Sequence, residues 1–192
     1  NFIHAVSGGS LYRKTSFLVD SLGRRIFPES LHIDERPHLA GGLASSMFDN
    51  DGVATRDRSV VVGGELQGYF LSAYTARKLG MATTGNAGGC HNLIVQSGQH
   101  DFSGLLKKMG RGLLVTELLG QGVNYVTGDY SRGAAGYWVE GGEIQHAVEE
   151  ITIAGNLRDM FLNIVDVGND VVVRGSRQVG SILVAEMKIA GV

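Results

Sequence analysis

Ser59-Val60-Val61-Val62-Gly63-Gly64-Glu65-Leu66-Gln67-Gly68-Tyr69-Phe70-Leu71 is the stretch that decides the fold class of this sequence. Two runs of strand-forming residues flank Gly63-Gly64, and a glycine pair supplies the positive φ angles that the tight turn of a β-hairpin needs. The next segment, from Ser72 to Gly80, has a serine at the helix N-cap position and a glycine at its end, and it predicts a short helix. The expected unit is a hairpin followed by a helix.

The same order of elements recurs further along the chain. Gly141-Gly142-Glu143-Ile144-Gln145 repeats Gly63-Gly64-Glu65-Leu66-Gln67 almost letter for letter. Tyr137 to Val139 would form the first strand, Ile151 to Ile153 would continue the second, and a helix would run from Asn156, as its cap, to Ile164. An internal duplication of residues 59–80 and 137–165 is one interpretation. The alternative is that this five-residue spelling is simply common in hairpins.

The remaining segments predict more strands than helices. Helices are expected from Leu11 to Leu22, ended by Gly23, and from Phe102 to Met109, capped by Asp101 and ended by Gly110. Gly112 to Leu119 predicts a buried strand, and further strands are expected at Asn124 to Thr127, Val171 to Val173 and Ser181 to Val184. Because hairpins and short helices join these strands, the expected class is α+β with a largely antiparallel sheet.

The composition is that of a folded domain whose net charge favours neither anionic nor cationic partners. Apolar residues make up 43% of the 192 residues, and 29 glycines against two prolines indicate many tight turns. The 17 Lys and Arg residues against 19 Asp and Glu residues give a net charge of −2, and no basic stripe stands out, so we expect no direct nucleic-acid partner. No uncharged stretch is apolar enough to cross a membrane, and we expect no membrane partner.

The cysteine count and the first residues of the sequence bear on cellular location and on domain organisation. Cys90 is the only cysteine, so no disulfide can form within the chain, and we expect a cytoplasmic protein. The sequence starts at Asn1 without an initiator Met and runs directly into Phe2-Ile3-His4-Ala5-Val6, as the inside of a domain would. We therefore expect an N-terminal portion of the protein to be missing from this chain.

No pattern of catalytic residues is evident. A zinc peptidase needs histidines at helical spacing with a nearby Glu, and none of the six histidines meets this requirement. Cys90 beside His91 would suit a cysteine nucleophile, but neighbouring side chains on a strand point to opposite faces. The glycine-rich stretch from Gly85 to Gly89 lacks the Lys-Ser/Thr of a phosphate loop and favours a tight turn.

The segment from Gly120 to Gly133 is the best candidate for a binding surface. Its polar and aromatic members, which we predict to contact a peptide or a partner, are Asn124, Tyr125, Asp129, Tyr130 and Arg132. This composition suits an extended peptide, which pairs through its backbone and contacts aromatic rings. The alternative is an ordinary hairpin with polar turn residues.

Eight blocks of sequence resemble the C-terminal region of the PmbA (TldE) type of the TldD/PmbA family of bacterial metalloprotease complexes. The blocks are Gly8–Leu18, Gln67–Ser72, Ala76–Met81, Thr84–Gly89, Thr116–Asn124, Gly128–Gly133, Glu149–Leu157 and Glu186–Gly191. They extend over nearly the whole chain. The resemblance implies that residues 1–192 are that C-terminal domain, with its α+β fold, and that the N-terminal domain that precedes it is absent from this chain.

The resemblance also implies where a metal site would lie. In this family the TldD subunit is the zinc peptidase, with an H-E-x-x-x-H motif and a cysteine ligand further on. Aligned through the shared Ala-Val, the three motif positions fall on Ile3, His4 and Gly8, and the cysteine falls within residues 174–180, which contain Ser176 but no Cys. An alignment shifted by one residue keeps His4 but places Ala5 and Gly9 at the other positions. No zinc is therefore expected in this chain, only in a TldD-like partner.

The function implied is that of a non-metal subunit, inactive alone, in a two-subunit protease that processes or degrades unfolded peptides. By resemblance, that system is linked to microcin maturation, antitoxin degradation and modulation of DNA gyrase. The expected partners are a TldD-like subunit and an unfolded peptide, with a homodimer as an alternative assembly. Two alternatives stay open, an independent peptidase with a non-metal nucleophile and a non-proteolytic adaptor that acts on DNA gyrase.

Overall fold

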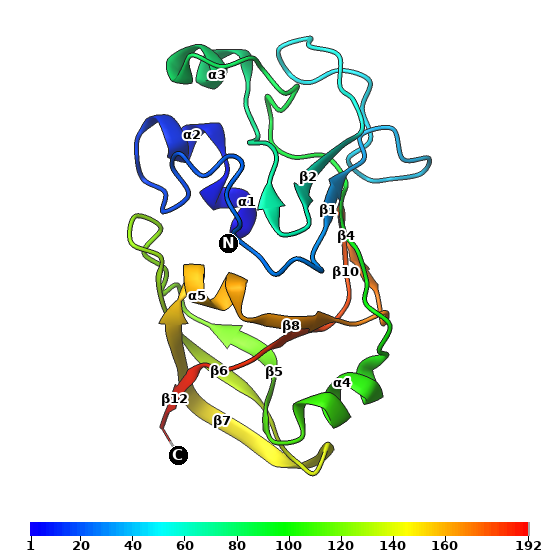
Figure 1. The fold of residues 1–192 in the computed structure, drawn as a ribbon, viewed down its shortest axis with the longest axis vertical. Coiled ribbons are helices and arrows are strands. Elements are labelled where there is room, and N and C mark those ends of the chain that lie inside the picture. The colour runs from blue at the N-terminus through cyan, green and yellow to red at the C-terminus, as the bar shows by residue number, and fades with distance from the viewer. Residues whose placement is uncertain (192) are drawn as a thin grey trace. The chain divides into compact units, whose positions relative to one another are not determined.

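The structure is a computed structural model that describes residues 1–191 (Figure 1). The chain divides into two compact units. Unit 1 comprises Asn1–Gln96 and Val172–Val179, and unit 2 comprises Ser97–Val171 and the segment that starts at Gly180. Among the described residues, no helix is long and apolar enough to cross a membrane.

Unit 1 is built on a six-stranded sheet with the order β3-β2-β1-β4-β10-β9. Every pairing in it is antiparallel except that of β4 with β10. Its strands are β1 (Ile33–Glu35), β2 (Arg58–Val62), β3 (Glu65–Leu66), β4 (Leu93–Val95), β9 (Val172–Arg174) and β10 (Arg177–Val179). Its helices are α1 (Phe2–Ala5), α2 (Gly8–Tyr12) and α3 (Ala73–Leu79). Val60, Val61 and Leu66 are fully buried and belong to its core.

The hairpin predicted around Gly63-Gly64 is present. Both glycines have positive φ angles, 56° and 76°, and a Cβ on Gly64 would lie 2.5 Å from the carbonyl oxygen of Pro28. The second strand is shorter than predicted, because β3 ends at Leu66. Beyond it the chain pairs with the N-terminal segment instead, since Phe70 N–H donates to Val6 O at 3.1 Å.

Helix predictions in unit 1 had mixed outcomes. The helix after Ser72 is confirmed: Ser72 and Thr75 form a reciprocal capping box, and Gly80 ends α3 with a φ of 67°. The helix predicted from Leu11 to Leu22 is wrong, because α2 ends at Tyr12. The hydroxyl of Ser16 donates to Ala5 O and accepts from Leu18 N–H, which replaces the helical pattern with a loop.

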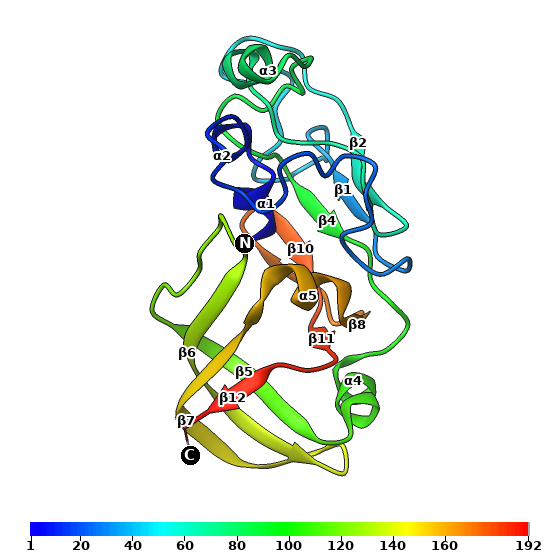
Figure 2. The same ribbon diagram turned by 60° about the vertical axis from the view of Figure 1, so that its left-hand side comes forward.

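Unit 2 contains a four-stranded antiparallel sheet with the order β12-β7-β6-β5 and an antiparallel pair, β11-β8. The strands are β5 (Gly112–Leu119), β6 (Asp129–Glu140), β7 (Glu143–Asn156), β8 (Ile164–Val167), β11 (Ile182–Val184) and β12 (Lys188–Ala190). The helices are α4 (Phe102–Met109) and α5 (Leu157–Leu162). Figure 2 shows that the four-stranded sheet is strongly curved.

Most predicted elements of unit 2 are confirmed. Asp101 caps α4, and Asn156 caps α5, which ends at Leu162. β5 has the predicted bounds but is an edge strand and not a buried one, with Leu118 and Leu119 exposed by 42% and 47%. The predicted strand from Asn124 to Thr127 is wrong, because these residues form a turn. These elements confirm the α+β class with largely antiparallel sheets.

The two hairpins with Gly-Gly turns are each followed by a helix, but they differ in size. β3 has two residues, whereas β7 has fourteen, and the hairpins belong to different sheets. The internal duplication therefore stays a hypothesis.

Candidate functional site: the metal-motif positions and an apolar groove

The three positions of the family's metal motif do not share one helix. Ile3 and His4 lie in α1, whereas Gly8 is the first residue of α2. Between the helices, Ser7 has an extended backbone with φ −74° and ψ 139°. His4 is exposed, Ile3 is half-buried and Gly8 is buried. A metal site needs several donors that converge on one point, and these three side chains are not arranged in that way.

Gly8 has no room for any side chain. A Cβ at this position would lie 2.6 Å from the Cβ of Thr75 and 3.0 Å from Cδ2 of Leu71. Thr75 is held in place because its N–H donates to Ser72 Oγ at 3.2 Å and its own Oγ1 accepts from Ser72 N–H at 3.0 Å. A histidine ligand at residue 8 would require α3 to move. The residues at the motif positions therefore do not fit a zinc ion.

The shifted alignment and the expected cysteine position supply no better set of donors. Ala5 is fully buried and offers no donor side chain. Ser176 lies between β9 and β10 and lines a hollow of about 250 Å³ together with Asn92. Within residues 1–191, no group of three or more His, Cys, Asp or Glu side chains is close enough to hold a metal ion.

Cys90 has the features of a structural thiol. Burial raises the pKa of the Cys90 thiol, and the nearby charge of Arg177 offsets this only in part. The ring of His91 is turned towards backbone carbonyls, with Nδ1 3.2 Å from Ala44 O and Nε2 3.0 Å from Gly85 O. A cysteine nucleophile needs a lowered pKa or an adjacent base, and this arrangement favours neither.

The glycine-rich loop before Cys90 closes over a buried ion pair that sequence analysis missed. Glu35 is only 1% exposed and accepts from Arg58 Nε at 2.7 Å, from Asn86 Nδ2 at 2.7 Å and from His91 N–H at 2.8 Å. Arg58 also donates to Asn86 Oδ1 at 3.0 Å. This network gives the glycine-rich loop a structural role, because Asn86 and His91 N–H bind the buried Glu35 carboxylate. Its members lie far apart in the sequence, and no local pattern could have revealed it.

Two predicted binding residues, Asn124 and Asp129, form the turn before β6. Asn124 N–H donates to Asp129 O at 2.8 Å, and Asn124 Oδ1 accepts from Val126 N–H at 3.0 Å. The Asp129 carboxylate accepts from Thr127 Oγ1 at 2.7 Å and from Asn156 Nδ2 at 3.2 Å. Both side chains thus stabilise the turn, and Tyr125 is half-buried within it.

The other two predicted residues, Tyr130 and Arg132, are on β6. Tyr130 is 4% exposed, and burial raises its pKa, with a smaller opposing effect of Arg132. Arg132 donates to the carbonyl oxygens of Leu118 and Leu119 at the end of β5. The structure therefore places Asn124 and Tyr125 in a turn, Asp129 where that turn meets β6, and Tyr130 and Arg132 on β6. Peptide binding by these five residues stays a prediction.

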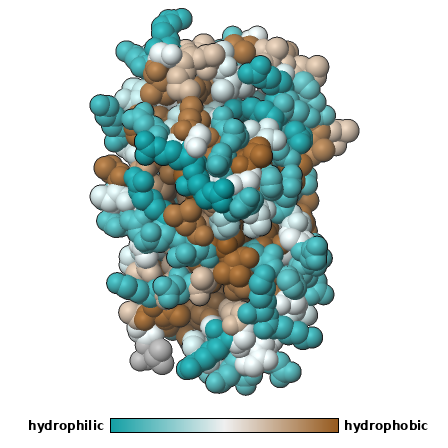
Figure 3. Space-filling model, viewed as in Figure 1, coloured by the Kyte–Doolittle hydropathy of each residue, from teal (hydrophilic) through white to brown (hydrophobic). Residues whose placement is uncertain are grey.

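Unit 2 contains an apolar groove of about 570 Å³. It is lined by α4, by β5, by Tyr130 and Ile153, and by the segment of residues 181–189 that includes β11 and part of β12. The sheet is curved, so its two edge strands, β5 and β12, both line this groove (Figure 2). Figure 3 shows hydrophobic side chains exposed among hydrophilic ones on the visible face of the protein. A groove with these walls can accept apolar side chains of an extended peptide.

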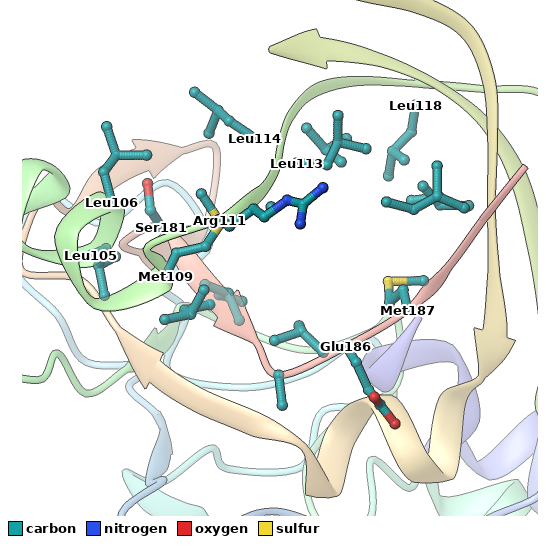
Figure 4. A pocket seen from close by; sticks show the side chains of 18 of the residues that line it. Leu105, Leu106, Met109, Arg111, Leu113, Leu114, Leu118, Ser181, Glu186 and Met187 are labelled. Atoms are coloured by element: carbon teal, nitrogen blue, oxygen red, sulfur yellow. The ribbon is translucent and has the colours of Figure 1, made fainter. Parts of the chain in front are cut away.

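Among the described residues, Arg111 is the only Lys or Arg that lines the groove. Figure 4 shows its side chain extending into the open space between Leu113 and Met187, whereas the Glu186 carboxylate points away from that space. The Arg111 guanidinium lies 5.5 Å from the centroid of the Trp138 ring. The groove thus combines apolar walls with a positive charge.

Comparison with known proteins agrees with this fold. The family model described as the PmbA/TldA metallopeptidase C-terminal domain matches residues 1–191. The chain belongs to the PmbA/TldD family. It is 56% identical over 191 residues to metalloprotease PmbA of Escherichia coli O157:H7, a match that covers 100% of this chain and 42% of the relative.

Solved structures of PmbA/TldD relatives have the same architecture. TldE from Thermococcus kodakarensis superposes with a TM-score of 0.87 at 25% identity, covering 100% of this chain and 46% of that chain. A proposed modulator of DNA gyrase from Thermotoga maritima gives a TM-score of 0.89 at 39% identity, covering 98% of this chain and 46% of that chain. The PmbA-like chain described here thus spans less than half the length of these relatives.

Proposed function

We propose that this PmbA-like chain belongs to the non-metal subunit of a TldD/TldE-type protease. The observation that carries the proposal is the contact of Gly8 with Thr75, which leaves no space for a ligand at a position where the family's zinc motif needs a histidine. The subunit is inactive alone and acts with a TldD-like partner, which holds the zinc. Its single cysteine, a half-buried thiol with a raised pKa, is consistent with a cytoplasmic location.

The subunit helps to hold an unfolded peptide for cleavage by the partner. The apolar groove offers walls for apolar side chains, and Arg111 offers a positive charge for a peptide carboxylate. The segment from Gly120 to Gly133 borders this groove through Tyr130. An unfolded chain exposes both apolar side chains and unpaired backbone groups, and an extended groove beside an edge strand complements both.

The test uses the full-length protein, purified with and without a TldD-like partner. Zinc is measured by elemental analysis, and hydrolysis is measured with an unstructured peptide. We expect stoichiometric zinc and cleavage only when the partner is present. Stoichiometric zinc together with cleavage by this protein alone would overturn the proposal.

An independent cysteine peptidase is not favoured by the raised pKa of Cys90. Replacement of Cys90 by Ala is expected to leave the activity of the reconstituted pair unchanged. A loss of more than about a hundredfold, ~2.7 kcal/mol of transition-state stabilisation, would restore the cysteine alternative.

An adaptor role is favoured by one observation, the description of the Thermotoga maritima relative as a proposed modulator of DNA gyrase. Capture of purified DNA gyrase by this protein in the absence of a TldD-like partner would support that role. Failure of the two purified proteins to associate would exclude a direct effect.

A further inference from the structure

Four cationic side chains lie on or directly after helices α2 and α3 of unit 1. Arg13 and Lys14 follow α2 directly, and Arg77 and Lys78 lie in the last turn of α3. All four are exposed. Two tyrosines belong to the same helices, Tyr12 to α2 and Tyr74 to α3. We call these six residues the basic–aromatic surface.

Aromatic contacts hold this surface together. The rings of Tyr12 and Tyr74 meet edge to face, with their centroids 5.9 Å apart. The Arg13 guanidinium lies 5.1 Å from the centroid of Tyr12, and the Lys78 ammonium lies 5.6 Å from the centroid of Tyr74. The close approach of Gly8 to Thr75 sets the distance between the two helices. Two of the cations are therefore held on rings and lose less freedom when a ligand binds.

None of the four cations has an acidic partner among residues 1–191. The ion pairs in that part of the chain involve Arg25, Arg36, Arg58, His100 and Lys108. Without the four cations, the chain would carry 13 Lys and Arg residues against 19 Asp and Glu residues, a balance of −6 in place of −2. The basic–aromatic surface is thus a local concentration of positive charge on a chain that is otherwise acidic, and it would attract an anionic ligand.

We propose that the basic–aromatic surface binds a carboxylate-rich, extended segment of another polypeptide. Exposed Tyr and Arg side chains are the residue types that contribute most to protein–protein binding, and Tyr74 is 55% exposed. An extended peptide of about eight residues reaches ~26 Å, which is enough to cross two short helices. Three or four carboxylates on such a peptide match the four cations.

A nucleic acid fits this surface less well. Specific binding to DNA commonly involves about six to ten neutralised phosphates, and the surface offers four cations. The acidic remainder of the chain would repel a long polyanion that extends beyond the surface. A short acidic segment avoids that repulsion.

This docking surface is separate from the apolar groove of unit 2 and does not depend on the proposed protease role. Loss of peptide binding at the basic–aromatic surface can therefore be distinguished from loss of peptide binding at the groove. Substitutions in the groove leave the α2–α3 cations unchanged, and the reverse also holds.

The test measures binding of a fluorescein-labelled peptide, of about eight residues with alternating Glu and Gly, to the full-length protein by anisotropy at low ionic strength. We expect the double variant Arg77→Ala, Lys78→Ala to bind at least about tenfold more weakly than the unsubstituted protein. The matched control is Arg56→Ala, Arg174→Ala, which removes two exposed cations of unit 1 that lie outside the surface. This control is expected to change binding by less than about twofold.

Thermal unfolding of each variant shows whether the fold is retained. A second control is Tyr74→Phe, which keeps the aromatic ring at residue 74. Binding of the acidic peptide should weaken as salt is raised, and an uncharged Gly-Ser peptide should not bind. Equal losses in the two double variants, absence of binding, or a preference for a single-stranded oligonucleotide of equal charge would each overturn the proposal.

Discussion

Gly8 packs against Thr75 so closely that a Cβ built on Gly8 would lie 2.6 Å from the Cβ of Thr75. This contact joins α2 to α3 at the point where the family's zinc motif would need its second histidine. Packing between the helices and a metal ligand at residue 8 are therefore mutually exclusive in this chain. The same contact also sets the spacing of the two helices that carry the basic–aromatic surface.

Substitution of Gly8 by Ala should destabilise the protein by ~1–3 kcal/mol, because the added methyl group would overlap Thr75 in a packed interior. Urea unfolding of the full-length protein measures the change. Gly9→Ala is the matched control, since a Cβ at Gly9 would meet only the flexible end of Arg13, at 3.0 Å, and we expect little change there. Equal stability of the Gly8 and Gly9 variants would contradict this expectation, because it would show that α3 shifts without cost to make room for a methyl group at residue 8.

Substitution of Glu35 by Gln should cost about 3–5 kcal/mol, because it leaves the Arg58 guanidinium in the interior without its carboxylate. Chemical denaturation followed by circular dichroism measures the loss. Glu29→Gln is the control, since Glu29 is 82% exposed and its pair with Arg25 has an N–O distance of 3.5 Å. That exposed pair should contribute less than about 1 kcal/mol. Similar effects of the two substitutions would contradict the role assigned to the buried network.

Asp166 should make the stability of the protein depend on pH in the acidic range. The hydrogen bond from Lys108 lowers the pKa of Asp166, burial opposes this, and a hydrogen bond from His100 lowers the pKa further. A carboxyl group whose pKa is lower in the folded state stabilises the fold above its unfolded pKa, near ~3.9, and the contribution is lost as the pH falls through the lower folded value. We therefore expect Asp166→Asn to be less stable than the unsubstituted protein at pH 7, with a difference that shrinks on acidification.

Lys108→Ala and Lys107→Ala provide a matched pair of variants for the Asp166 contact. Lys108 Nζ lies 2.7 Å from Asp166 Oδ2, whereas Lys107, its neighbour on α4, is exposed and has no ion pair within the described part of the chain. Thermal unfolding at pH 7 should reveal a loss of stability for Lys108→Ala alone. A constant difference between Asp166→Asn and the unsubstituted protein from pH 7 to pH 3 would contradict this account.

Substitution of Met187 by Glu should weaken binding of an apolar unfolded peptide by at least about tenfold, because a charge in the apolar groove is costly to desolvate. Val165→Glu is the control, since Val165 is 41% exposed and lies outside both the groove and the segment from Gly120 to Gly133. Fluorescence anisotropy of a labelled, Leu-rich unstructured peptide measures the affinity. If both variants bind as tightly as the unsubstituted protein, peptides do not use the groove. The acidic Glu-Gly peptide should bind both variants equally, because the basic–aromatic surface is unchanged.

Local chemistry was sufficient to predict many individual elements. Gly63-Gly64 and Gly141-Gly142 predicted both hairpin turns, and Ser72, Asp101 and Asn156 predicted three helix starts, since caps and turns depend on residues close in sequence. The helix expected from Leu11 to Leu22 was wrong because a contact between distant residues, Ser16 with Ala5, replaces it. The exposure of β5 also could not be predicted, because strand order in a sheet is a long-range property.

The sequence by itself determined the α+β class, the family and the mismatch between Ile3, His4 and Gly8 and the His, Glu and His of the family's zinc motif, because each depends on residue identity or on short spacing. Only the tertiary structure decided why residue 8 cannot hold a ligand, which groups surround Glu35 and where the apolar groove lies. It also brought Tyr12, with Arg13 on its ring, into contact with Tyr74, which carries Lys78, although no basic stripe is visible in the sequence. The physical reason is that side-chain packing and charge concentration depend on distances in space, and segments far apart along the chain create them.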